Sequence, residues 1–253
     1  GWIDYANACA QESEVCEREA MPMSRSDDMM MAYFTSGTTS WPKMVPRNHG
    51  YALAHAVTGK FWMDLQKNDI HWTLSDTGWA KAAYGMLFPQ WLIGTTIVLY
   101  DGSPVYPDMN AMWRLVEEAG ITYFGTSAPF ISACMKAGVE PGQNCDLTAL
   151  RGIGSTASPL PPEGFNWVYQ HVKSDLLLGS TSGGTDICTS LAISCPILPV
   201  YAGELQCRAL GTALLAFDET GESVTDVVGD LVVAQPMPSM PLYLWGDADG
   251  SRY

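Results

Sequence analysis

Residues 35–43, Thr-Ser-Gly-Thr-Thr-Ser-Trp-Pro-Lys, hold the groups in this sequence that are best suited to chemistry. Their hydroxyl side chains and backbone amides are hydrogen-bond donors, and Lys43 adds one cation, so the segment has what a polyphosphate site needs. Small hydroxyl residues around a glycine also describe an ordinary turn, and composition alone leaves that alternative open. The chemistry that this segment predicts is phosphate binding.

The segment is not the phosphate loop of the P-loop nucleotide hydrolases. That motif, G-x-x-x-x-G-K-[ST], requires glycine where Pro42 stands and a hydroxyl residue after the lysine, where Met44 follows Lys43. The sequence therefore excludes the P-loop interpretation, and any phosphate binding must use a different loop geometry.

The other reactive side chains are dispersed along the chain. The seven cysteines include no C-x-x-C pair, and the four histidines show no H-E-x-x-H or Cys/His spacing. No G-x-S-x-G motif marks a nucleophilic serine. A histidine-held metal, dithiol chemistry and hydrolase mechanisms are therefore disfavoured. We expect reduced, mostly buried cysteines and, because no apolar run reaches ~18 residues, a cytoplasmic protein without a membrane span.

The charge balance restricts the class of partner. The formal net charge is −14, from 13 Lys and Arg against 27 Asp and Glu. Such a chain lacks the broad positive field that holds a nucleic-acid backbone or an anionic membrane, so neither is an expected partner. Anionic small molecules stay possible, because a few amides and one lysine can bind phosphate locally. The charge therefore does not exclude ATP.

Hydrophobic periodicity predicts the elements that must position the loop. An apolar run at residues 29–34 is typical of a buried strand and leads directly into the loop. Beyond it, helix-like and strand-like segments alternate. Helices are expected at residues 51–65, 80–91, 109–118, 129–136 and 165–172, and strands at 70–74, 95–100, 121–124 and 176–178. This alternation predicts an α/β fold with a mostly parallel, helix-covered sheet.

The two ends of the chain differ from its middle. Residues 1–28 are acidic, show no helix or strand period, and are interpreted as a connecting region. From about residue 207, short strands with turn signals indicate a smaller β-rich subdomain. The predicted organisation is an α/β core over residues 1–206 followed by a partial β-rich subdomain over residues 207–253.

The loop resembles Thr-Ser-Gly-Thr-Thr-x-x-Pro-Lys, the signature of the adenylate-forming superfamily, which binds the β- and γ-phosphates of ATP. The resemblance implies the large N-terminal α/β domain of those enzymes. Ser40 stands where the family usually has glycine, the residue with the fewest backbone restrictions. The positions to which the resemblance assigns ATP binding are Thr35, Ser36, Gly37, Thr38, Thr39 and Lys43.

Residues 75–81, Ser-Asp-Thr-Gly-Trp-Ala-Lys, resemble a D-x-G-W stretch that lines the acyl pocket in the same family. The resemblance implies that Trp79, Ala80 and Lys81 bind the acid substrate. Residue type alone favours the other interpretation for Trp79, a core side chain, because a large aromatic ring is usually buried.

Residues 154–160 resemble the loop that borders the adenine ring, which implies nucleotide binding by Ala157, Ser158 and Pro159, with Ala157 where glycine is usual. The Gly152-x-Gly154-x-x-Ala157 pattern also fits a permissive dinucleotide fingerprint. Prolines follow it at once, however, where a Rossmann loop would open a helix, and no acidic residue stands at the expected distance. A Rossmann dehydrogenase is therefore disfavoured.

Residues 181–186, Thr-Ser-Gly-Gly-Thr-Asp, resemble the aromatic-Gly-x-Thr-Glu motif of the family. The resemblance implies that Asp186 holds Mg²⁺ beside the ATP phosphates and that Thr185 contacts the α-phosphate. Acetyl-CoA synthetases carry tryptophan where Gly183 stands, so glycine implies room for a longer acyl group. The implied catalytic residues are Thr185, Asp186 and Lys43, and further nucleotide-binding residues are Thr181 and Ser182.

Residues 95–253 resemble the acetoacetyl-CoA synthetase branch of the AMP-forming acyl-CoA synthetases, whereas residues 28–94 are more similar to bacterial medium-chain acyl-CoA synthetases. The implied reaction activates acetoacetate, or a short or medium-chain acid, with ATP and Mg²⁺ to an acyl-adenylate and then passes the acyl group to CoA. The family's C-terminal lid domain is absent from the matched residues, so we expect a fragment. A medium-chain ligase, a noncatalytic nucleotide-binding remnant and a plain scaffold are the alternatives.

Overall fold

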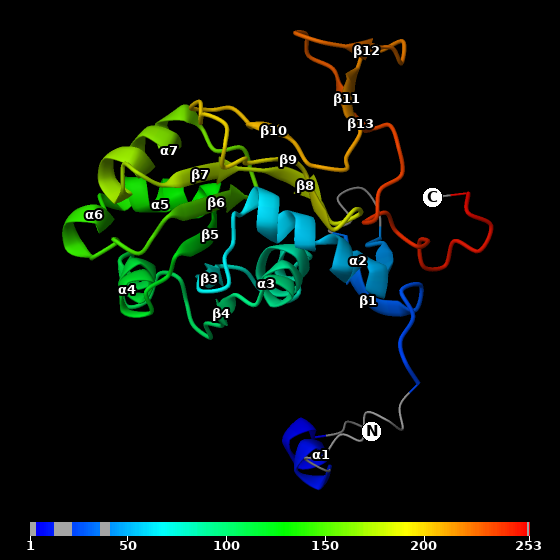
Figure 1. Ribbon diagram of the computed structural model, residues 1–253, viewed down its shortest axis with the longest axis horizontal. Helices are drawn as coiled ribbons and strands as arrows, with labels where there is room; N and C mark the ends of the chain where they lie inside the picture. Colours follow the sequence, from blue (N-terminus) through cyan, green and yellow to red (C-terminus); the bar gives the residue numbers. More distant parts are fainter. Residues whose placement is uncertain (1–3, 13–21, 36–40, 252) are drawn as a thin grey trace.

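The computed structural model describes residues 4–12, 22–35, 41–251 and 253. At its centre is a five-stranded parallel sheet in the order β4-β3-β5-β6-β7 (Figure 1). The strands are β3 (Ile70–Thr73), β4 (Thr96–Val98), β5 (Tyr123–Ser127), β6 (Gly152–Thr156) and β7 (Leu177–Ser180). Helices lie between successive strands along the chain, as parallel crossovers require. The predicted α/β class with a parallel sheet is confirmed.

Helices and π-helical segments pack against both faces of this sheet. One face carries α2 (His49–Ala54), η2 (Thr58–Trp62), η3 (Ala83–Leu87) and α3 (Phe88–Ile93). The other carries α4 (Ala111–Glu118), α5 (Ala128–Ala137), α7 (Pro162–Trp167) and η4 (Val168–Val172), with α6 (Pro141–Asn144) against η4. Local signals set some of these ends: Ser127 Oγ accepts from the Phe130 amide at the start of α5, and Gly138 ends it with a φ of 64°.

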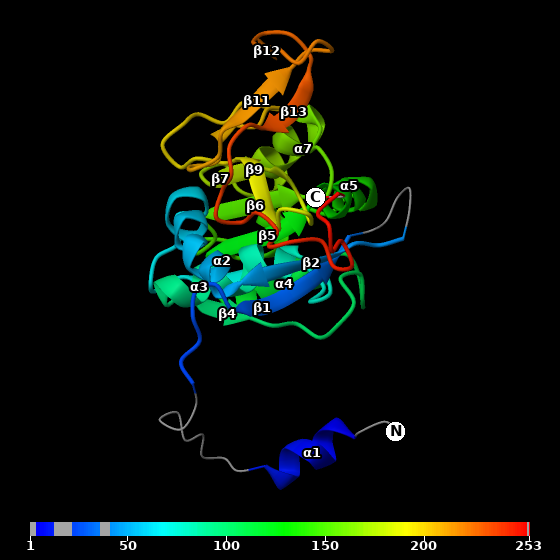
Figure 2. The same ribbon diagram turned by 90° about the vertical axis from the view of Figure 1, so that its right-hand side faces the viewer.

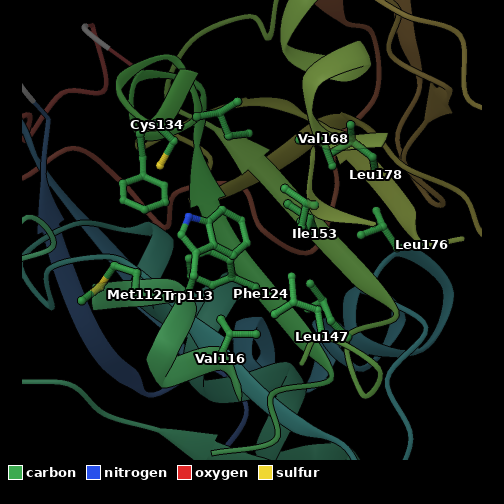
Figure 3. Packing of buried hydrophobic residues seen from close by; sticks show 14 of the residues in the cluster. Met112, Trp113, Val116, Phe124, Cys134, Leu147, Ile153, Val168, Leu176 and Leu178 are labelled. Carbon is green, nitrogen blue, oxygen red and sulfur yellow. The ribbon is translucent and has the colours of Figure 1, made fainter. Parts of the chain in front are cut away.

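Strand alternation divides the sheet side chains between two cores. Phe124 and Ile153 lie in the core under α4, α5 and α7 (Figure 3), and Trp72 belongs to the same core. The neighbouring Tyr123 belongs with Tyr51 to the core under the other helices. Successive residues of a strand point to opposite faces, so a strand buried on both sides needs apolar residues at consecutive positions. Burial on both faces thus explains the unbroken apolar runs that predicted these strands.

Smaller antiparallel sheets surround the parallel one. Their strands are β1 (Met29–Phe34) with β2 (Met44–Asn48); β8 (Ser182–Gly184), β9 (Thr189–Ile193) and β10 (Cys207–Arg208); and β11 (Leu214–Phe217), β12 (Ser223–Val224) and β13 (Asp230–Val233). Figure 2 shows the β11, β12 and β13 sheet beyond the parallel sheet, at the end of the molecule opposite α1 (Tyr5–Gln11).

Several sequence expectations need correction. The opening segment contains helix α1, which is too short to show a period and begins with Asp4 Oδ1 accepting from the Asn7 amide at 2.8 Å. The helix expected over residues 51–65 is split, because α2 ends at Ala54 and η2 follows. Strand β2 was not expected, since Pro46 and Arg47 are atypical of a buried strand.

Strand β6 was also missed, because its glycines suggested a loop. A Cβ at Gly152 would come within 2.7 Å of the Tyr123 ring, and a Cβ at Gly154 within 2.6 Å of the Tyr123 hydroxyl oxygen. Glycine is thus required by close packing between neighbouring strands and not by a turn. The same placement gives a physical reason to reject the dinucleotide fingerprint, since its glycines lie inside a strand instead of after one.

Within the part of the chain that the structure describes, no helix has the length and apolar character needed to cross a membrane. The described cysteines are free thiols. The expectation that they are mostly buried was wrong: Cys134 and Cys188 are buried, Cys9 is exposed, and the others, Cys145, Cys195 and Cys207, are half-buried.

We predict that Phe124→Ala lowers the free energy of unfolding by about 3–5 kcal/mol, because the ring is fully buried and its loss leaves a cavity. Phe124 stacks on Trp72 at 4.9 Å and lies edge-on to Trp113 at 5.5 Å between ring centroids. Urea denaturation measures the change. As a control, Phe61→Ala should cost within about 1 kcal/mol, since that ring is 49% exposed. Equal losses in the two variants would contradict this account of the core.

We predict that Ala157→Gly raises the free energy of unfolding by about 0.5–1 kcal/mol. Ala157 directly follows β6 with a φ of 74°, and left-handed strain of ~1–2 kcal/mol outweighs the ~0.4–1 kcal/mol that glycine adds in unfolded-chain entropy. Denaturation by urea tests the sign. The matched substitution Ala133→Gly inside helix α5 should instead destabilise the protein by about 1 kcal/mol. A loss of stability on Ala157→Gly would show that this backbone is unstrained.

Candidate active site

A cavity of about 680 Å³ opens at the carboxyl ends of the parallel strands. Its walls are the end of β5, the segments that follow β3, β6 and β7, the β8–β9 hairpin, and Gly203 and Leu205 from the segment before β10. Ligands of open α/β sheets bind at this edge because all the connecting loops leave the strands there. The cavity is therefore the candidate site on position alone.

The structure brings most of the predicted residues to this cavity. Those that line it are Trp79, Ala80, Lys81, Ala157, Ser158, Pro159, Thr181, Ser182, Gly183 and Thr185. Asp186 follows Thr185, and its carboxylate Oδ1 lies 3.2 Å from Nζ of Lys43. The predicted residues Ser36, Gly37, Thr38 and Thr39 lie outside the described part of the chain, so their roles stay predictions.

The β1–β2 hairpin holds the two ends of the predicted phosphate loop together. The Thr35 amide donates to the Lys43 carbonyl at 2.9 Å, and the Lys43 amide donates to Thr35 Oγ1 at 3.0 Å. These two hydrogen bonds fix the positions of the first and last residues of the loop. The Lys43 ammonium is not used by them and donates to the Asp186 carboxylate. The two charged side chains are 39% and 56% exposed, so the ion pair contributes little to stability and can be exchanged for a ligand.

Two residues that sequence reasoning missed hold the turn that carries Asp186. Arg47 of β2 is buried, and its Nη2 donates to the Thr185 carbonyl at 3.2 Å and to the Asp186 carbonyl. Tyr51 of α2 donates its hydroxyl proton to the Cys188 carbonyl at 2.6 Å. Burial lowers the pKa of the Arg47 guanidinium and raises the pKa of the Tyr51 hydroxyl. The sequence signal that could have identified Arg47 is a charged residue next to the apolar residues of this segment.

Lys81 lines the cavity. Its Nζ donates to the Thr126 carbonyl at 2.7 Å, at the end of β5. Part of the side chain borders the cavity, yet the surrounding protein excludes enough water to lower the pKa of Lys81 to about 7. The amine of this cavity-lining residue can therefore change charge near neutral pH. Trp79 nearby is 67% exposed, so the core interpretation of that residue was wrong.

The structure gives a reason for glycine at position 183 that the sequence did not indicate. A Cβ at this position would overlap the backbone of β9 at the Thr189 oxygen and at Ser190 Cα. Strands β8 and β9 approach there beside a register shift between Ser182 and Gly183. Any side chain at 183 therefore requires the hairpin to move. The predicted effect of Gly183 on acyl-chain length stays a prediction.

The donor set fits a magnesium ion that is shared with a nucleotide. Among the described residues, no group of three His, Cys, Asp or Glu side chains could hold a metal by itself. Asp186 offers one carboxylate, and the Lys43 ammonium beside it shows that this position accepts a cation. Mg²⁺ is commonly bound by one or two carboxylates, substrate phosphates and water, so a single protein carboxylate suffices.

Comparison with known proteins agrees with this architecture. The chain is 38% identical to an acetoacetyl-CoA synthetase of Xenopus tropicalis over 249 residues, which cover 96% of this chain and 35% of that protein. It is 38% identical to an acetoacetyl-coenzyme A synthetase of Rhizobium meliloti, with 87% and 34% covered. The structure of an acetoacetyl-CoA synthetase from Streptomyces lividans matches with a TM-score of 0.84 and 44% identity, over 90% of this chain and 35% of that one.

The chain thus spans about a third of the length of the relatives that it matches. A sequence model of the AMP-binding enzyme family matches residues 3–244, which is nearly the whole chain and includes the β1–β2 hairpin, the parallel sheet and the cavity. The resemblance first seen in residues 35–43 is therefore confirmed, and the chain belongs to the AMP-binding enzyme family.

Proposed function

We propose that this chain carries the ATP- and acyl-binding core of an AMP-forming acid–thiol ligase. The observation that carries the proposal is the convergence, at one cavity, of the segments after the parallel strands with the Lys43–Asp186 pair. The cavity supplies hydroxyl, amide and ammonium donors to an anionic ligand, and Asp186 supplies one carboxylate to its cation. That combination suits a nucleotide polyphosphate with Mg²⁺.

The proposed first step joins two anions. A carboxylate oxygen of the acid forms a bond to the α-phosphorus of ATP, the bond from that phosphorus to the bridging oxygen breaks, and pyrophosphate leaves. In the second step the CoA sulfur bonds to the acyl carbon, AMP leaves and the thiol proton is released. Repulsion between the reactants makes charge neutralisation and positioning the main tasks of the protein.

We assign these tasks to residues around the cavity. Ser158 and Pro159, with Ala157, border the adenine, Thr185 donates to the α-phosphate, and Lys43 neutralises phosphate charge once it leaves Asp186. Further contacts to the nucleotide are assigned to Thr35, Ser36, Gly37, Thr38, Thr39, Thr181 and Ser182. A magnesium ion held by Asp186 would supply further neutralisation of the phosphate charge.

For the acid, we propose acetoacetate. The names of the relatives support this choice. Lys81 also supports it, because the amine of this cavity-lining residue can donate a hydrogen bond to the ketone oxygen of acetoacetate. A saturated medium-chain acid would leave that amine facing methylene groups, at a cost in desolvation. Trp79, Ala80 and Gly183 complete the proposed acyl contacts.

The proposal extends to organisation and setting. The α/β core is assigned to residues 1–206 and the β-rich subdomain to residues 207–253, although β10 still pairs with β9 across that boundary. CoA is the proposed second substrate. Free thiols at the described cysteines support a cytoplasmic setting. A nucleotide-binding chain without catalysis is the second candidate, because the donors around the cavity also suit nucleotide binding alone.

Pyrophosphate release from ATP tests the proposed function directly. We expect release that depends on Mg²⁺ and on acetoacetate, with weaker release on butyrate and hexanoate. Binding of ATP without release on any acid would favour the noncatalytic candidate. Failure to bind ATP, observed as no nucleotide-dependent change in melting temperature, would contradict both candidates and leave a scaffold.

We predict that Asp186→Asn slows Mg²⁺-dependent pyrophosphate release by about 100-fold or more, equivalent to about 3 kcal/mol in the transition state, because the amide cannot replace the anionic ligand. Asp175→Asn is the matched control, since that carboxylate is 77% exposed and lies before β7, at the other end of the sheet. Equal rates in the two variants would remove Asp186 from the site.

We predict that Lys81→Met reduces the preference for acetoacetate over butyrate by about tenfold, the value of a hydrogen bond from a charged donor. The acids differ by a carbonyl in place of a methylene, so their ratio of pyrophosphate-release rates isolates that contact. Because the pKa of Lys81 is about 7, the wild-type preference should be larger below that pH, where the amine is charged, and smaller above it. The control is Lys136→Met on the exposed side of α5. A pH-independent ratio that Lys81→Met leaves unchanged would contradict the assignment.

A further inference from the structure

Arg47 is a buried cation that has no partner anion among the residues that the structure describes. The residue is 1% exposed, and among the described residues no ion pair joins its guanidinium to a carboxylate. Its Nε and Nη1 also lack a hydrogen-bond partner within the described ranges. A buried charge is costly unless it is paired or strongly hydrogen-bonded. We therefore looked for the role of Arg47 in the hydrogen bonds that its Nη2 makes.

Those contacts converge on one turn. Nη2 of Arg47 donates to the carbonyls of both Thr185 and Asp186. The Cys188 amide donates to the Thr185 carbonyl at 3.1 Å and closes the turn over residues 185–188. Hydrogen bonds from a charged donor to a carbonyl are stronger than neutral ones, so the guanidinium fixes the backbone on both sides of the Thr185–Asp186 peptide.

Tyr51 holds the same turn from a second direction. Its hydroxyl lies 2.6 Å from the Cys188 carbonyl and 3.2 Å from Sγ of that residue. The Arg47 guanidinium lies 5.9 Å from the centre of the Tyr51 ring, which stabilises the cation. Cys188 itself has a φ of 49°, a conformation that a non-glycine residue keeps only when its surroundings enforce it. Arg47 and Tyr51 provide that enforcement.

The spacing along β2 adds a second point of attachment. Lys43 and Arg47 are four residues apart along an extended segment, so both side chains point to the same face. Lys43 binds the Asp186 carboxylate at an exposed position, whereas Arg47 binds the Asp186 carbonyl in the interior. The outer contact can be exchanged for a ligand while the inner one keeps the backbone in place.

We infer that Arg47, supported by Tyr51, is a positioning residue that holds the Thr185–Asp186 turn in the geometry needed to bind ATP together with Mg²⁺. The inference rests on the proposed ATP site and deepens it. Arg47 touches neither the substrate nor the metal in this role. It fixes the direction in which the Asp186 carboxylate and the Thr185 hydroxyl leave the backbone.

The test compares Arg47→Met with the wild-type chain and with Arg114→Met, which removes an exposed arginine of α4 that pairs with Asp108. Calorimetry measures the dissociation constant of ATP with and without Mg²⁺. We expect Arg47→Met to reduce the Mg²⁺-dependent gain in affinity by about tenfold or more, as the loss of residues behind metal ligands commonly does. Affinity for AMP and for ATP without Mg²⁺ should fall much less, because these ligands lose only the Thr185 contact to the α-phosphate. Arg114→Met should resemble wild type.

A second readout does not need a nucleotide. Amide hydrogen exchange at residues 185–188 should accelerate in Arg47→Met and, to a smaller extent, in Tyr51→Phe, while exchange in β5 and β6 stays unchanged. Arg47→Lys should give an intermediate loss of the Mg²⁺ effect, because one ammonium cannot reproduce the planar geometry of a guanidinium between two carbonyls.

The outcomes separate this inference from the function on which it rests. An unchanged Mg²⁺ effect in Arg47→Met overturns the positioning role while leaving the ATP site intact. Uniform loss of exchange protection and of affinity for every nucleotide also overturns it, because Arg47 would then stabilise the fold in general. If the wild-type chain binds ATP without any Mg²⁺ effect, the proposed metal role of Asp186 and this inference both fail.

Discussion

The parallel pairing of β3, β5, β6 and β7 is the constraint on which the site depends. Because these strands run in the same direction, their carboxyl ends and the segments that follow meet at one edge of the sheet. Helices bury both faces of the strands. The aromatic contact between Phe124 of β5 and Trp113 of α4 packs that helix against the sheet (Figure 3). Residues far apart in the sequence thereby come to surround a single cavity.

The sequence predicted the parts of this arrangement that depend on local signals. Apolar runs and helical periodicity located most elements of the parallel sheet, and the family resemblance located Lys81, Ala157, Thr185 and Asp186, which lie at or beside the cavity. The resemblance also drew attention to Trp79, although residue type alone would have placed that ring in the core.

Features set by distant contacts could not be predicted. The glycines of β6 are explained by the Tyr123 ring on the neighbouring strand, and Gly183 by the backbone of β9. Arg47 interrupts the apolar pattern of a buried strand because its partners are carbonyls 138 and 139 positions later in the chain. Periodicity describes one element at a time, and it carries no information about such pairings.

Asp186 lies where these long-range contacts meet. Its carboxylate is held by an exposed cation that a ligand can displace, and its carbonyl by a buried cation that stays in place. The carboxylate can therefore release Lys43 and bind a ligand while the backbone of Asp186 stays in place. A single contact could not do both. This arrangement also explains how a loop-borne carboxylate can be precise without a preformed metal cage.

The central claim is that the cavity at the strand ends is the nucleotide site. Photolabelling the chain with a radioactive azido-ATP, followed by peptide mapping, tests it most directly. The account predicts that label enters the segment after β6, around Ser158 and Pro159, and that unlabelled ATP competes it away. Competed label found elsewhere, or label that ATP does not compete, would contradict the account.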